Sequence, residues 1–364
     1  MKKLKIAFLS GGNFTHTLAY LDFFRDRGHK VYWITYDRAE KHYDIPMFDI
    51  SFGAKGTMFS SKWKYLLAAL SIRKVLREIK PDILHGHYVT SAGLICLVSA
   101  FTPYVLTAHG SDLIESMKSI IWKKILRYAF KKAALVNVVS EDLAFVTRDL
   151  GVPQEKVLVA TLGVDTKVFT YQPNEDIQSP IRLLCTRSLE VVYDPETIVN
   201  ACEILHHRNI PFILTFAASG SLQHALENLV EKKGLTRLIH FLGGYNNSNL
   251  PIILRNHNIC ISASLWDGTS ICLLEAMACG IFPIVSRINS NQAWLKENSS
   301  AYMFESGNAH ELSEKIILAL GNKSIRSSGI KQNRRLIEEK GDREKNMFLI
   351  EKRYYQIVSN NPSA

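Results

Sequence analysis

The sequence contains no hydrophobic run long enough to cross a bilayer. Its most apolar stretches, such as residues 92–101, fall short of the roughly 20 residues that a membrane helix needs. The basic start leads directly into an apolar strand and shows no signal-peptide pattern. Cysteine is sparse, and no C-x-x-C pair occurs among Cys96, Cys185, Cys202, Cys260, Cys272 and Cys279. Because such scatter is typical of buried thiols in a reducing compartment, we expect a cytoplasmic protein.

Motifs for several kinds of chemistry are absent as well. No Asp-x-Asp triplet and no His/Cys cluster with metal-ligand spacing occurs, so we expect neither a metal nor another cofactor. The sequence also lacks a Ser-His-Asp hydrolase elbow, a Walker A loop, a kinase motif set and a G-x-G-x-x-G fingerprint.

The composition is that of a globular protein with uneven charge. With 364 residues, 47% of them hydrophobic, the chain can bury the cores of two domains. Residues 1–165 hold 23 basic against 15 acidic residues, a net of +8, and the remainder adds only +2 to reach +10. No helix-turn-helix, zinc finger or aromatic RNA-binding signature accompanies this charge, so we expect no nucleic-acid partner.

Residues 117–132 combine apolar and basic positions at helical spacing. Lysines and arginines surround an apolar stripe formed by Ile121, Trp122, Ile125, Leu126 and Ala129. The stripe either packs on the sheet of its own domain or lies in an anionic headgroup layer, where each basic residue adds roughly 1 kcal/mol. The second alternative would make the protein peripheral to the inner face of the cell membrane.

Apolar strand patterns alternate with helical ones along the whole chain. In the first half, strands are predicted over 5–10, 30–35, 83–87, 104–108, 135–139 and 157–160, and helices over 15–27 and 63–79. After a linker at 162–169, strands are predicted over 181–186, 212–216, 238–242, 258–262 and 282–286, and helices over 195–207, 223–233, 270–279 and 309–320. This alternation predicts two doubly wound, Rossmann-like α/β domains, 1–165 and 166–342, with ligands in a central cleft.

Residues 266–285 form the most informative segment. They predict a loop, a helix that Thr269 or Ser270 can cap and that ends at Gly280, and a buried strand. We expect the loop and helix start, from Gly268 through Thr269 and Ser270 to Ile271, to bind phosphate at the positive end of the helix dipole. The carboxylates of Asp267 and Glu275 bracket this position and can accept hydrogen bonds from hydroxyls on either side of a diphosphate. A nucleotide sugar has that layout.

The same segment resembles a known family. Asp267 and Glu275, with seven residues between them and Ala-Met-Ala-Cys-Gly and Phe-Pro-Ile-Val after them, resemble the paired-acid signature of family 4 glycosyltransferases, retaining enzymes of the GT-B fold. The resemblance implies that Asp267, where the family usually has glutamate, contacts the donor sugar and that Glu275 holds the ribose. It also implies that 163–169 is the interdomain crossover and that a helix over 343–358, within 343–364, returns to the first domain.

Candidate residues of the first domain follow its strands. Gly11 and Gly12 come after the first strand, where glycine permits either a tight turn or close approach to a ligand. The resemblance places this loop near the diphosphate and the acceptor, with His16 as a further contact. His109 ends the strand 104–108 within a segment similar to the family's His-Gly-x-Asp motif, which implies a hydrogen bond from a neutral imidazole to the donor sugar without a large shift of its pKa.

Two further histidines and one arginine also end strands. His85 and His87, at the end of strand 83–87, are candidates of the same kind as His109, although a lone histidine is more often structural. Arg187 ends strand 181–186 and either lies on the surface or makes bidentate contacts to phosphate oxygens, and the resemblance favours phosphate. Many relatives place a lysine near Tyr193, which we expect to offer a neutral hydrogen bond instead.

The resemblance implies an enzyme that moves a sugar from a nucleoside diphosphate, most simply UDP, to a glycan or lipid-linked hydroxyl without a metal. The first domain would serve the acceptor and the second the donor. Two alternatives remain open at this stage. One is a nucleotide-sugar 2-epimerase or phosphorylase of the same fold, and the other is a non-catalytic nucleotide-sugar-binding partner protein.

Overall fold

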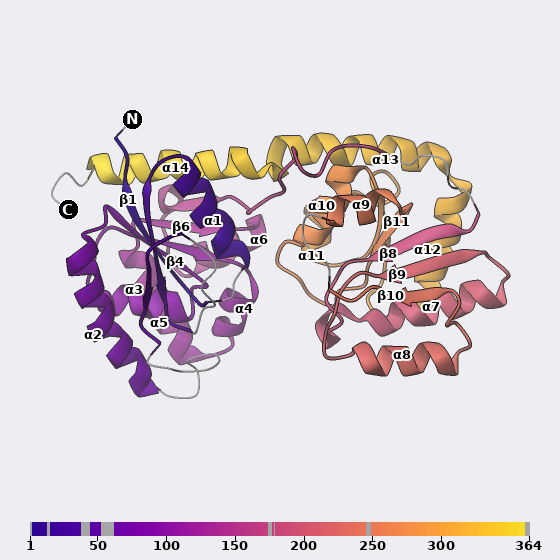
Figure 1. Cartoon of the computed structure of the whole chain (residues 1–364), viewed down its shortest axis with the longest axis horizontal. Coiled ribbons are helices and arrows are strands. Elements are labelled where there is room, and N and C mark those ends of the chain that lie inside the picture. The colour runs from indigo at the N-terminus through magenta and orange to yellow at the C-terminus, as the bar shows by residue number, and fades with distance from the viewer. Residues whose placement is uncertain are drawn as a thin grey trace. The chain divides into compact units, whose positions relative to one another are not determined.

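The computed structural model describes residues 2–12, 15–37, 44–51, 62–173, 177, 179–244 and 249–360. The chain divides into two compact units, one made of residues 1–162 and 344–364 and the other of residues 163–343 (Figure 1). The domain boundaries predicted at 165 and 342 lie within a few residues of these limits. None of the helices in the described ranges has both the length and the apolar character that crossing a membrane requires.

The first unit contains a parallel sheet in the order β3-β2-β1-β4-β5-β6-β7. Its strands are β1 (Lys5–Ser10), β2 (Lys30–Thr35), β3 (Met47–Asp49), β4 (Ile83–His87), β5 (Tyr104–Ala108), β6 (Leu135–Val138) and β7 (Val157–Val159). Its helices are α1 (Thr15–Asp26), α2 (Lys62–Ile79), α3 (Ser91–Ser99), α4 (Ser111–Met117), α5 (Ile120–Lys132), α6 (Glu141–Asp149) and α14 (Arg343–Asn360). The six predicted strands are present, and the three-residue β3 is an addition.

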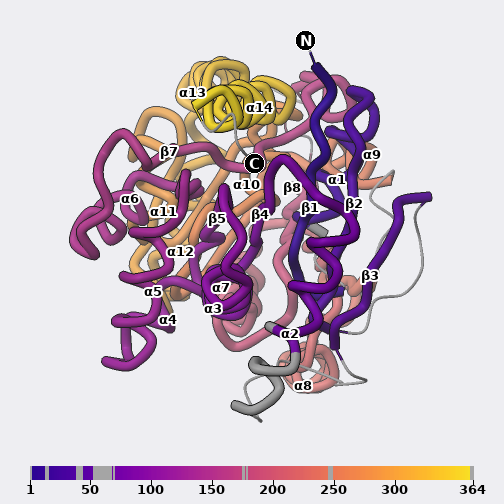
Figure 2. The backbone as a smooth tube through the Cα atoms, turned by 90° about the vertical axis from the view of Figure 1, so that its left-hand side faces the viewer, coloured from indigo at the N-terminus to yellow at the C-terminus, as the bar shows by residue number. Residues whose placement is uncertain are grey.

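Alternation along the strands sorts the side chains of this sheet onto two faces. Ala7 and Leu9 of β1 join an apolar cluster with residues of α2, α3 and α5. Phe8, between them, faces the other way and packs on Phe24 of α1, whose ring stacks on Tyr354 of α14 at 5.1 Å. Figure 2 shows α14 lying beside this unit. Side chains that point to the same face of the sheet as Phe8 therefore pack toward α1 and α14.

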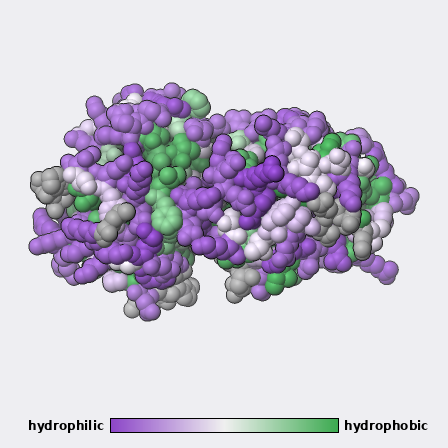
Figure 3. All heavy atoms as spheres, turned by 90° about the horizontal axis from the view of Figure 1, so that it is seen from above, coloured by the Kyte–Doolittle hydropathy of each residue, from purple (hydrophilic) through white to green (hydrophobic). Residues whose placement is uncertain are grey.

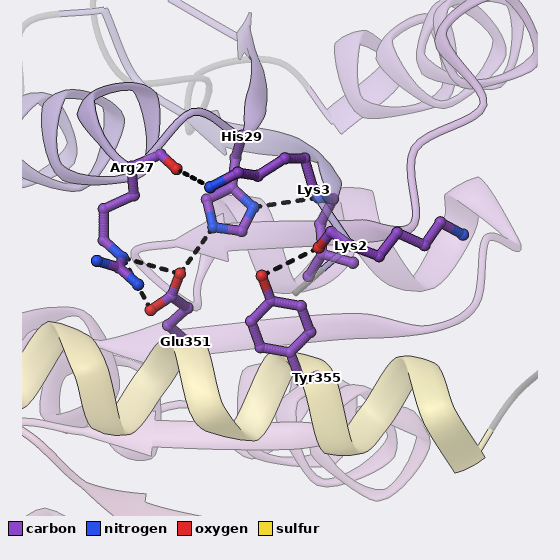
Figure 4. A network of polar contacts seen from close by, with 7 residues as sticks. Lys2, Lys3, Arg27, His29, Glu351 and Tyr355 are labelled. Carbon is purple, nitrogen blue, oxygen red and sulfur yellow. Dashed lines mark hydrogen bonds and ion pairs between the residues drawn. The ribbon is translucent and has the colours of Figure 1, made fainter.

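A buried carboxylate fastens α14 to the first unit (Figure 4). Glu351, 5% exposed, accepts hydrogen bonds from Arg27 at 3.0 Å and from Nε2 of His29 at 2.8 Å. Nδ1 of His29 accepts from the backbone N–H of Leu4, so the proton of a neutral ring lies on Nε2 and points at Glu351. The Tyr355 hydroxyl adds a bond to the carbonyl of Lys2 at 3.0 Å.

The second unit contains another parallel sheet, in the order β10-β9-β8-β11-β12-β13. Its strands are β8 (Ile181–Cys185), β9 (Phe212–Phe216), β10 (Ile239–Phe241), β11 (Ile259–Ser262), β12 (Phe282–Ser286) and β13 (Tyr302–Phe304). Its longer helices are α7 (Pro195–His207), α8 (Gln223–Lys232), α9 (Leu250–Arg255), α10 (Ile271–Cys279), α12 (Ala309–Gly321) and α13 (Lys323–Leu336). Here β13, α9 and α13 were not predicted.

Both sheets reverse their order beside their first strand. In the first unit β1 pairs with β2 on one side and with β4 on the other, and in the second β8 pairs with β9 and β11 in the same way. Loops that leave neighbouring strands in opposite directions at such a switch point open a crevice where ligands of doubly wound sheets bind. The two-domain α/β prediction is confirmed, and it gives each unit one favoured site.

The two chain segments that pass between the units are hydrogen-bonded to each other. Val164 donates to the carbonyl of Gly341 at 2.7 Å, and Arg343 donates to the carbonyl of Val164 at 3.0 Å. Gly163 adopts φ +68°, and a Cβ on it would lie 2.4 Å from the Gly341 oxygen. Glycine is therefore required here by both backbone conformation and space.

Candidate functional site

At the switch point of the second unit, four predicted residues form what we call the arginine cluster: Arg187, Tyr193, Asp267 and Ser270. Arg187 follows β8 and Asp267 lies in the loop after β11, and their side chains form an ion pair at 2.7 Å. A second guanidinium nitrogen of Arg187 donates to the Ser270 hydroxyl at 3.1 Å. The side chains of Arg187 and Asp267 are only 11% and 14% exposed, so this is a shielded cationic group, not a surface arginine.

Tyr193 supports Arg187 through its ring. It ends a short 3-10 turn (Val191–Tyr193), and the guanidinium carbon of Arg187 lies 3.9 Å from the ring centroid. Such a cation–π contact holds the planar guanidinium in one orientation. The sequence suggested only a neutral hydrogen bond from Tyr193, because ring stacking depends on a turn geometry that spacing does not reveal.

The start of α10 has the form expected of an anion site. Ser270 is the N-cap, and its hydroxyl accepts from the backbone N–H of Leu273 at 3.3 Å, so Ser270 rather than Thr269 holds this role. In the described part of the chain, the backbone N–H groups of Ile271 and Cys272 donate to no protein acceptor. Ser270 is 4% exposed, whereas Ile271 and Cys272 are half-buried. The helix ends at Gly280 in the left-handed conformation, φ +84°, as predicted.

The loop before α10 orients Asp267. The backbone N–H of Gly268 donates to Oδ1 of Asp267 at 2.8 Å, while Oδ2 faces Arg187. Burial raises the pKa of Asp267, although Arg187 and the Gly268 N–H oppose the rise. Both oxygens of this carboxylate are thus engaged within the protein.

Glu275 lies five residues beyond the N-cap, roughly 7–8 Å along the helix axis. Burial raises its pKa to about 7, against the attraction of Arg343. Its carboxylate has no hydrogen-bond partner among the described residues, and Glu275 is half-buried. It is therefore a carboxylate with free acceptor capacity, about one and a half turns into α10.

Four histidines meet at the switch point of the first unit, and we call them the histidine cluster: His16, His85, His87 and His109. Nδ1 of His87 lies 3.1 Å from Nε2 of His109, and the rings of His16 and His109 stack at 5.2 Å. The structure thus brings together all the histidines that the sequence singled out. Burial, with help from the neighbouring rings of His87 and His16, lowers the pKa of His109 well below its usual range, a shift that the sequence did not indicate.

Asp112 fixes the backbone beside His109. Its Oδ1 accepts from the backbone N–H of His109 at 3.0 Å and of Gly110 at 2.9 Å, and its Oδ2 accepts from Val89 at 2.7 Å. The sequence contained this residue in the His-Gly-x-Asp segment but gave it no role. Its contacts show that the aspartate of the motif serves to shape the loop that carries the histidine.

The predicted glycine loop lies at the end of β1. Gly11 and Gly12 are buried, and the hydroxyl of the preceding Ser10 donates to the Gly11 carbonyl at 3.0 Å. Residues 13 and 14, which separate Gly12 from α1 in the sequence, lie outside the described residues. The proposed contacts of this loop with a ligand stay predictions.

The described residues contain no group of three or more His, Cys, Asp or Glu side chains arranged to hold a metal ion. The expected independence of metal is a statement about the reaction and stays a prediction. All six cysteines are free thiols, and five of them are buried.

The basic helix predicted over 117–132 is present as α5, and only Met117 of that stretch belongs to α4. Leu126 and Ala129 of the apolar stripe are fully buried, and Trp122 and Ile125 are half-buried, so most of the stripe packs on the domain. Ile121 is the exception at 68% exposed. The packing alternative thus accounts for the helix body and leaves its first turn unexplained.

Two protein families match the chain. The family described as Glycosyl transferase 4-like matches residues 5–140, and the family described as Glycosyl transferases group 1 matches residues 169–340. Among curated relatives, the Escherichia coli UDP-Gal:alpha-D-GlcNAc-diphosphoundecaprenol alpha-1,3-galactosyltransferase is 26% identical over 66% of this chain and 67% of its own length.

Solved structures show the same fold at low identity. A sucrose-phosphate synthase from Thermosynechococcus elongatus superposes with a TM-score of 0.82 and 15% identity over 98% of this chain and 100% of its own. Anabaena HepE in complex with UDP superposes with a TM-score of 0.78 and 12% identity over 96% and 99% of the two chains.

Proposed function

The chain belongs to the group 1 glycosyltransferases of the family 4 type, with the GT-B fold of two Rossmann-like domains, and from this premise we propose that it transfers a hexose from a UDP-sugar to a glycan or lipid-linked hydroxyl with retention of configuration. One observation carries the proposal. In the second unit, Arg187, the free N–H groups at the start of α10 and the unpartnered carboxylate of Glu275 lie in the order that binds a diphosphate and then a ribose.

In the proposed reaction the bond between the sugar anomeric carbon and the β-phosphate oxygen breaks, and a bond to the acceptor oxygen forms on the same face. The proton of the acceptor hydroxyl passes to the departing phosphate oxygen, so no separate general base is needed. Arg187 and the N–H groups of α10 stabilise the negative charge that develops on the diphosphate, which is the work that a divalent cation would otherwise do. Asp267 and His109 orient the sugar, with Gly11, Gly12 and His16 near the acceptor.

Similar proteins support two parts of this proposal, UDP as the nucleotide and a lipid-linked acceptor. One relative carries both UDP-Gal and a diphosphoundecaprenol acceptor in its name, and one structural neighbour holds UDP. Other relatives are named for colanic acid biosynthesis, which supports a role in making a cell-envelope polysaccharide.

Replacing Glu275 by alanine tests the assignment. A hydrogen bond to a charged group contributes about 1.5–3 kcal/mol, so Glu275→Ala should weaken UDP binding by roughly tenfold to a hundredfold in calorimetric titrations. Glu231→Ala, an exposed glutamate of α8 in the same unit, is the matched control and should bind as the wild type does. Unchanged affinity in Glu275→Ala would count against the ribose contact.

Activity assays separate the proposed function from its rivals. The full chain should release UDP from a UDP-sugar only when a lipid extract supplies an acceptor. Conversion of the donor alone would indicate an epimerase, and binding of UDP-sugars without turnover in any acceptor extract would indicate a non-catalytic partner protein.

We also propose that the first turn of α5 contacts an anionic membrane surface. Ile120 and Ile121 are 76% and 68% exposed, and the neighbouring Lys118, Lys123 and Lys124 are exposed as well. Exposed isoleucines ringed by lysines fit a surface that offers both acyl chains and negative headgroups. Most of the face shown in Figure 3 is hydrophilic, with apolar side chains gathered in patches.

Vesicle flotation tests this contact. The chain should float with vesicles containing phosphatidylglycerol and not with phosphatidylcholine alone, and Lys123→Gln with Lys124→Gln should weaken binding roughly thirtyfold, at about 1 kcal/mol per lysine. Ile121→Ser should weaken it too, whereas the same change at Ile252, an isoleucine of the second unit that is 58% exposed, should not. Equal flotation of both isoleucine variants would remove α5 from the membrane surface.

A further inference from the structure

His87 is the member of the histidine cluster that contacts His109 directly. Its Nδ1 lies 3.1 Å from Nε2 of His109, and its ring is 0% exposed. Tyr20 approaches that ring edge to face at 4.5 Å, and His85 lies at 4.3 Å. Nε2 of His87 has no hydrogen-bond partner among the described residues. Only one proton fits between the two facing nitrogens, so a neutral pair has two arrangements.

The two arrangements differ in what they leave buried. If His109 donated from Nε2, His87 would accept at Nδ1 and carry its own proton on Nε2, where that N–H would have no acceptor. If His87 donates from Nδ1, its buried Nε2 is a bare nitrogen, and the N–H without a protein acceptor lies instead on Nδ1 of His109, which is half-buried and not fully enclosed. Buried N–H groups without an acceptor are the rarer kind of unpaired polar group in folded proteins, so the second arrangement is favoured.

We propose that His87 is a positioning residue, which donates from Nδ1 to His109 and fixes His109 as its Nδ1–H tautomer. Nδ1 of His109 has no hydrogen-bond partner in the described ranges and His109 is half-buried, so this N–H is available to an oxygen atom of the bound substrate. The identity of that oxygen rests on the proposed transferase function. The tautomer itself does not.

The surroundings of His87 hold its ring in place. The neighbouring His85, whose ring is tilted against that of His87, is fixed at both ring nitrogens, by Thr107 Oγ1 at 2.7 Å on Nε2 and by the hydroxyl of Tyr354 on Nδ1. Because Tyr354 belongs to α14, the returning helix takes part in the support of His109. The alternation of β4 explains the arrangement, since His85 and His87 are two residues apart and must share one face of the sheet.

The ionisable groups in contact with the pair are His16, His85, Tyr20, Tyr88 and Asp112. Burial lowers the pKa of His87 well below its usual range, and His85 and His16 add to this effect. Burial raises the pKa values of Tyr20 and Tyr354. Both carboxylate oxygens of Asp112 accept hydrogen bonds from backbone N–H groups. A neutral pair is the state to which the tautomer argument applies.

Nitrogen-15 NMR of the full chain with labelled histidines measures the tautomer directly. The His109 signals, assigned by their loss in His109→Gln, should show a protonated Nδ1 and an unprotonated Nε2 at pH 7.5. A protonated Nε2 would overturn the proposal. This measurement needs no substrate, so it decides the question even if the chain proves to have no transferase activity.

Two substitutions of His87 separate donation from packing. In His87→Asn the amide nitrogen can take the place of Nδ1 as a donor, so the tautomer of His109 and most of the turnover should survive. In His87→Asp only an acceptor remains, so the proton of His109 should move to Nε2 and kcat should fall about tenfold or more, with a smaller change in KM for UDP-glucose. His206→Asn, on the exposed end of α7, controls for the label and should match the wild type.

The outcomes bear on different claims. Equal NMR patterns and equal kcat for His87→Asn and His87→Asp would overturn the positioning role. If UDP-glucose with a lipid extract gives no UDP release in the wild type, the transferase proposal fails, while the wild-type tautomer still tests His87. Should His87→Asp fail to fold, the wild-type and His87→Asn spectra remain sufficient.

Discussion

Single side chains in the arginine and histidine clusters make contacts that the surrounding sequence does not predict. Arg187 is held between a carboxylate and an aromatic ring, and its charge is therefore fixed in direction before any ligand arrives. A bound diphosphate would compete with Asp267 for that charge, so the ion pair has to be exchanged when the donor binds. Under the proposed function, Asp267 holds Arg187 before a donor binds and contacts the sugar afterwards.

Glu275 makes stability depend on pH. Its folded pKa of about 7 exceeds the usual 4.5 because of burial, so ionisation is harder in the folded state than in the unfolded one. The wild type should therefore lose stability relative to Glu275→Gln as pH rises from about 4.5 to about 7, with a difference of up to about 3 kcal/mol above that range. Below pH 4.5 the difference in the free energy of unfolding between the two proteins should no longer change with pH, because Glu275 is protonated in both the folded and the unfolded state.

Thermal melting of both proteins at pH 5 and pH 8 checks this prediction. Glu275→Gln should gain in melting temperature relative to the wild type between the two values. Parallel shifts with pH would contradict a buried, ionising Glu275. Saturating UDP should reduce the difference, because the ribose hydroxyls would stabilise the charged carboxylate.

Among the elements, α14 depends most on one buried group. Burial opposes ionisation of Glu351, yet hydrogen bonds from Arg27 and His29 lower its pKa. Glu351→Ala would leave His29 without its acceptor inside the protein and should weaken the docking of α14 by about 2 kcal/mol. Glu351→Gln keeps an acceptor for His29 and should cost less.

Hydrogen exchange of the α14 amides measures this docking. A loss of about 2 kcal/mol corresponds to roughly thirtyfold faster exchange where local opening controls the rate. Glu338→Ala, an exposed glutamate outside α14, is the control and should leave these amides unchanged. Exchange in Glu351→Ala at the wild-type rate would show that the aromatic contacts of Tyr354 hold the helix alone.

Periodicity was sufficient to predict the long elements and insufficient for the short or polar ones. β1 and α7 were predicted to the residue because a buried apolar run or an amphipathic pattern ends at a clear stop. β13 is three residues long, and α13 buries Arg326, Gly329 and Asn333 beside a single apolar side chain, Ile330. Such elements are stabilised mainly by tertiary contacts, which a single sequence does not display.

The candidate sites were predictable in their membership and not in their geometry. Residues that follow strands at a switch point lie near one another, so together with the family resemblance Arg187, Asp267 and His109 could be named as candidates from the sequence. That Tyr193 stacks on Arg187, or that His87 bonds to His109, depends on turn conformation and strand register over several ångströms. Those contacts appear only when the backbone is placed.

At the scale of the whole molecule, the pairing of the two crossover segments depends on a single glycine, Gly163. Gly163→Ala meets two costs, the left-handed φ of +68° and a Cβ only 2.4 Å from the Gly341 oxygen, so we expect a loss of well over 2 kcal/mol. Gly151→Ala is the matched control, since Gly151 has φ +81° with no atom within 4 Å of the added Cβ and meets only the first cost, about 1–2 kcal/mol.

Melting and limited proteolysis of the full chain distinguish the two costs. Gly163→Ala should melt several degrees below Gly151→Ala, and protease should cut it faster near residues 163 and 341, because the bonds joining Val164 to Gly341 and Arg343 would be broken. Equal melting temperatures would mean that the crossovers separate without cost to either unit. In that case the hydrogen bonds between them contribute nothing to stability, and the glycine serves only the turn.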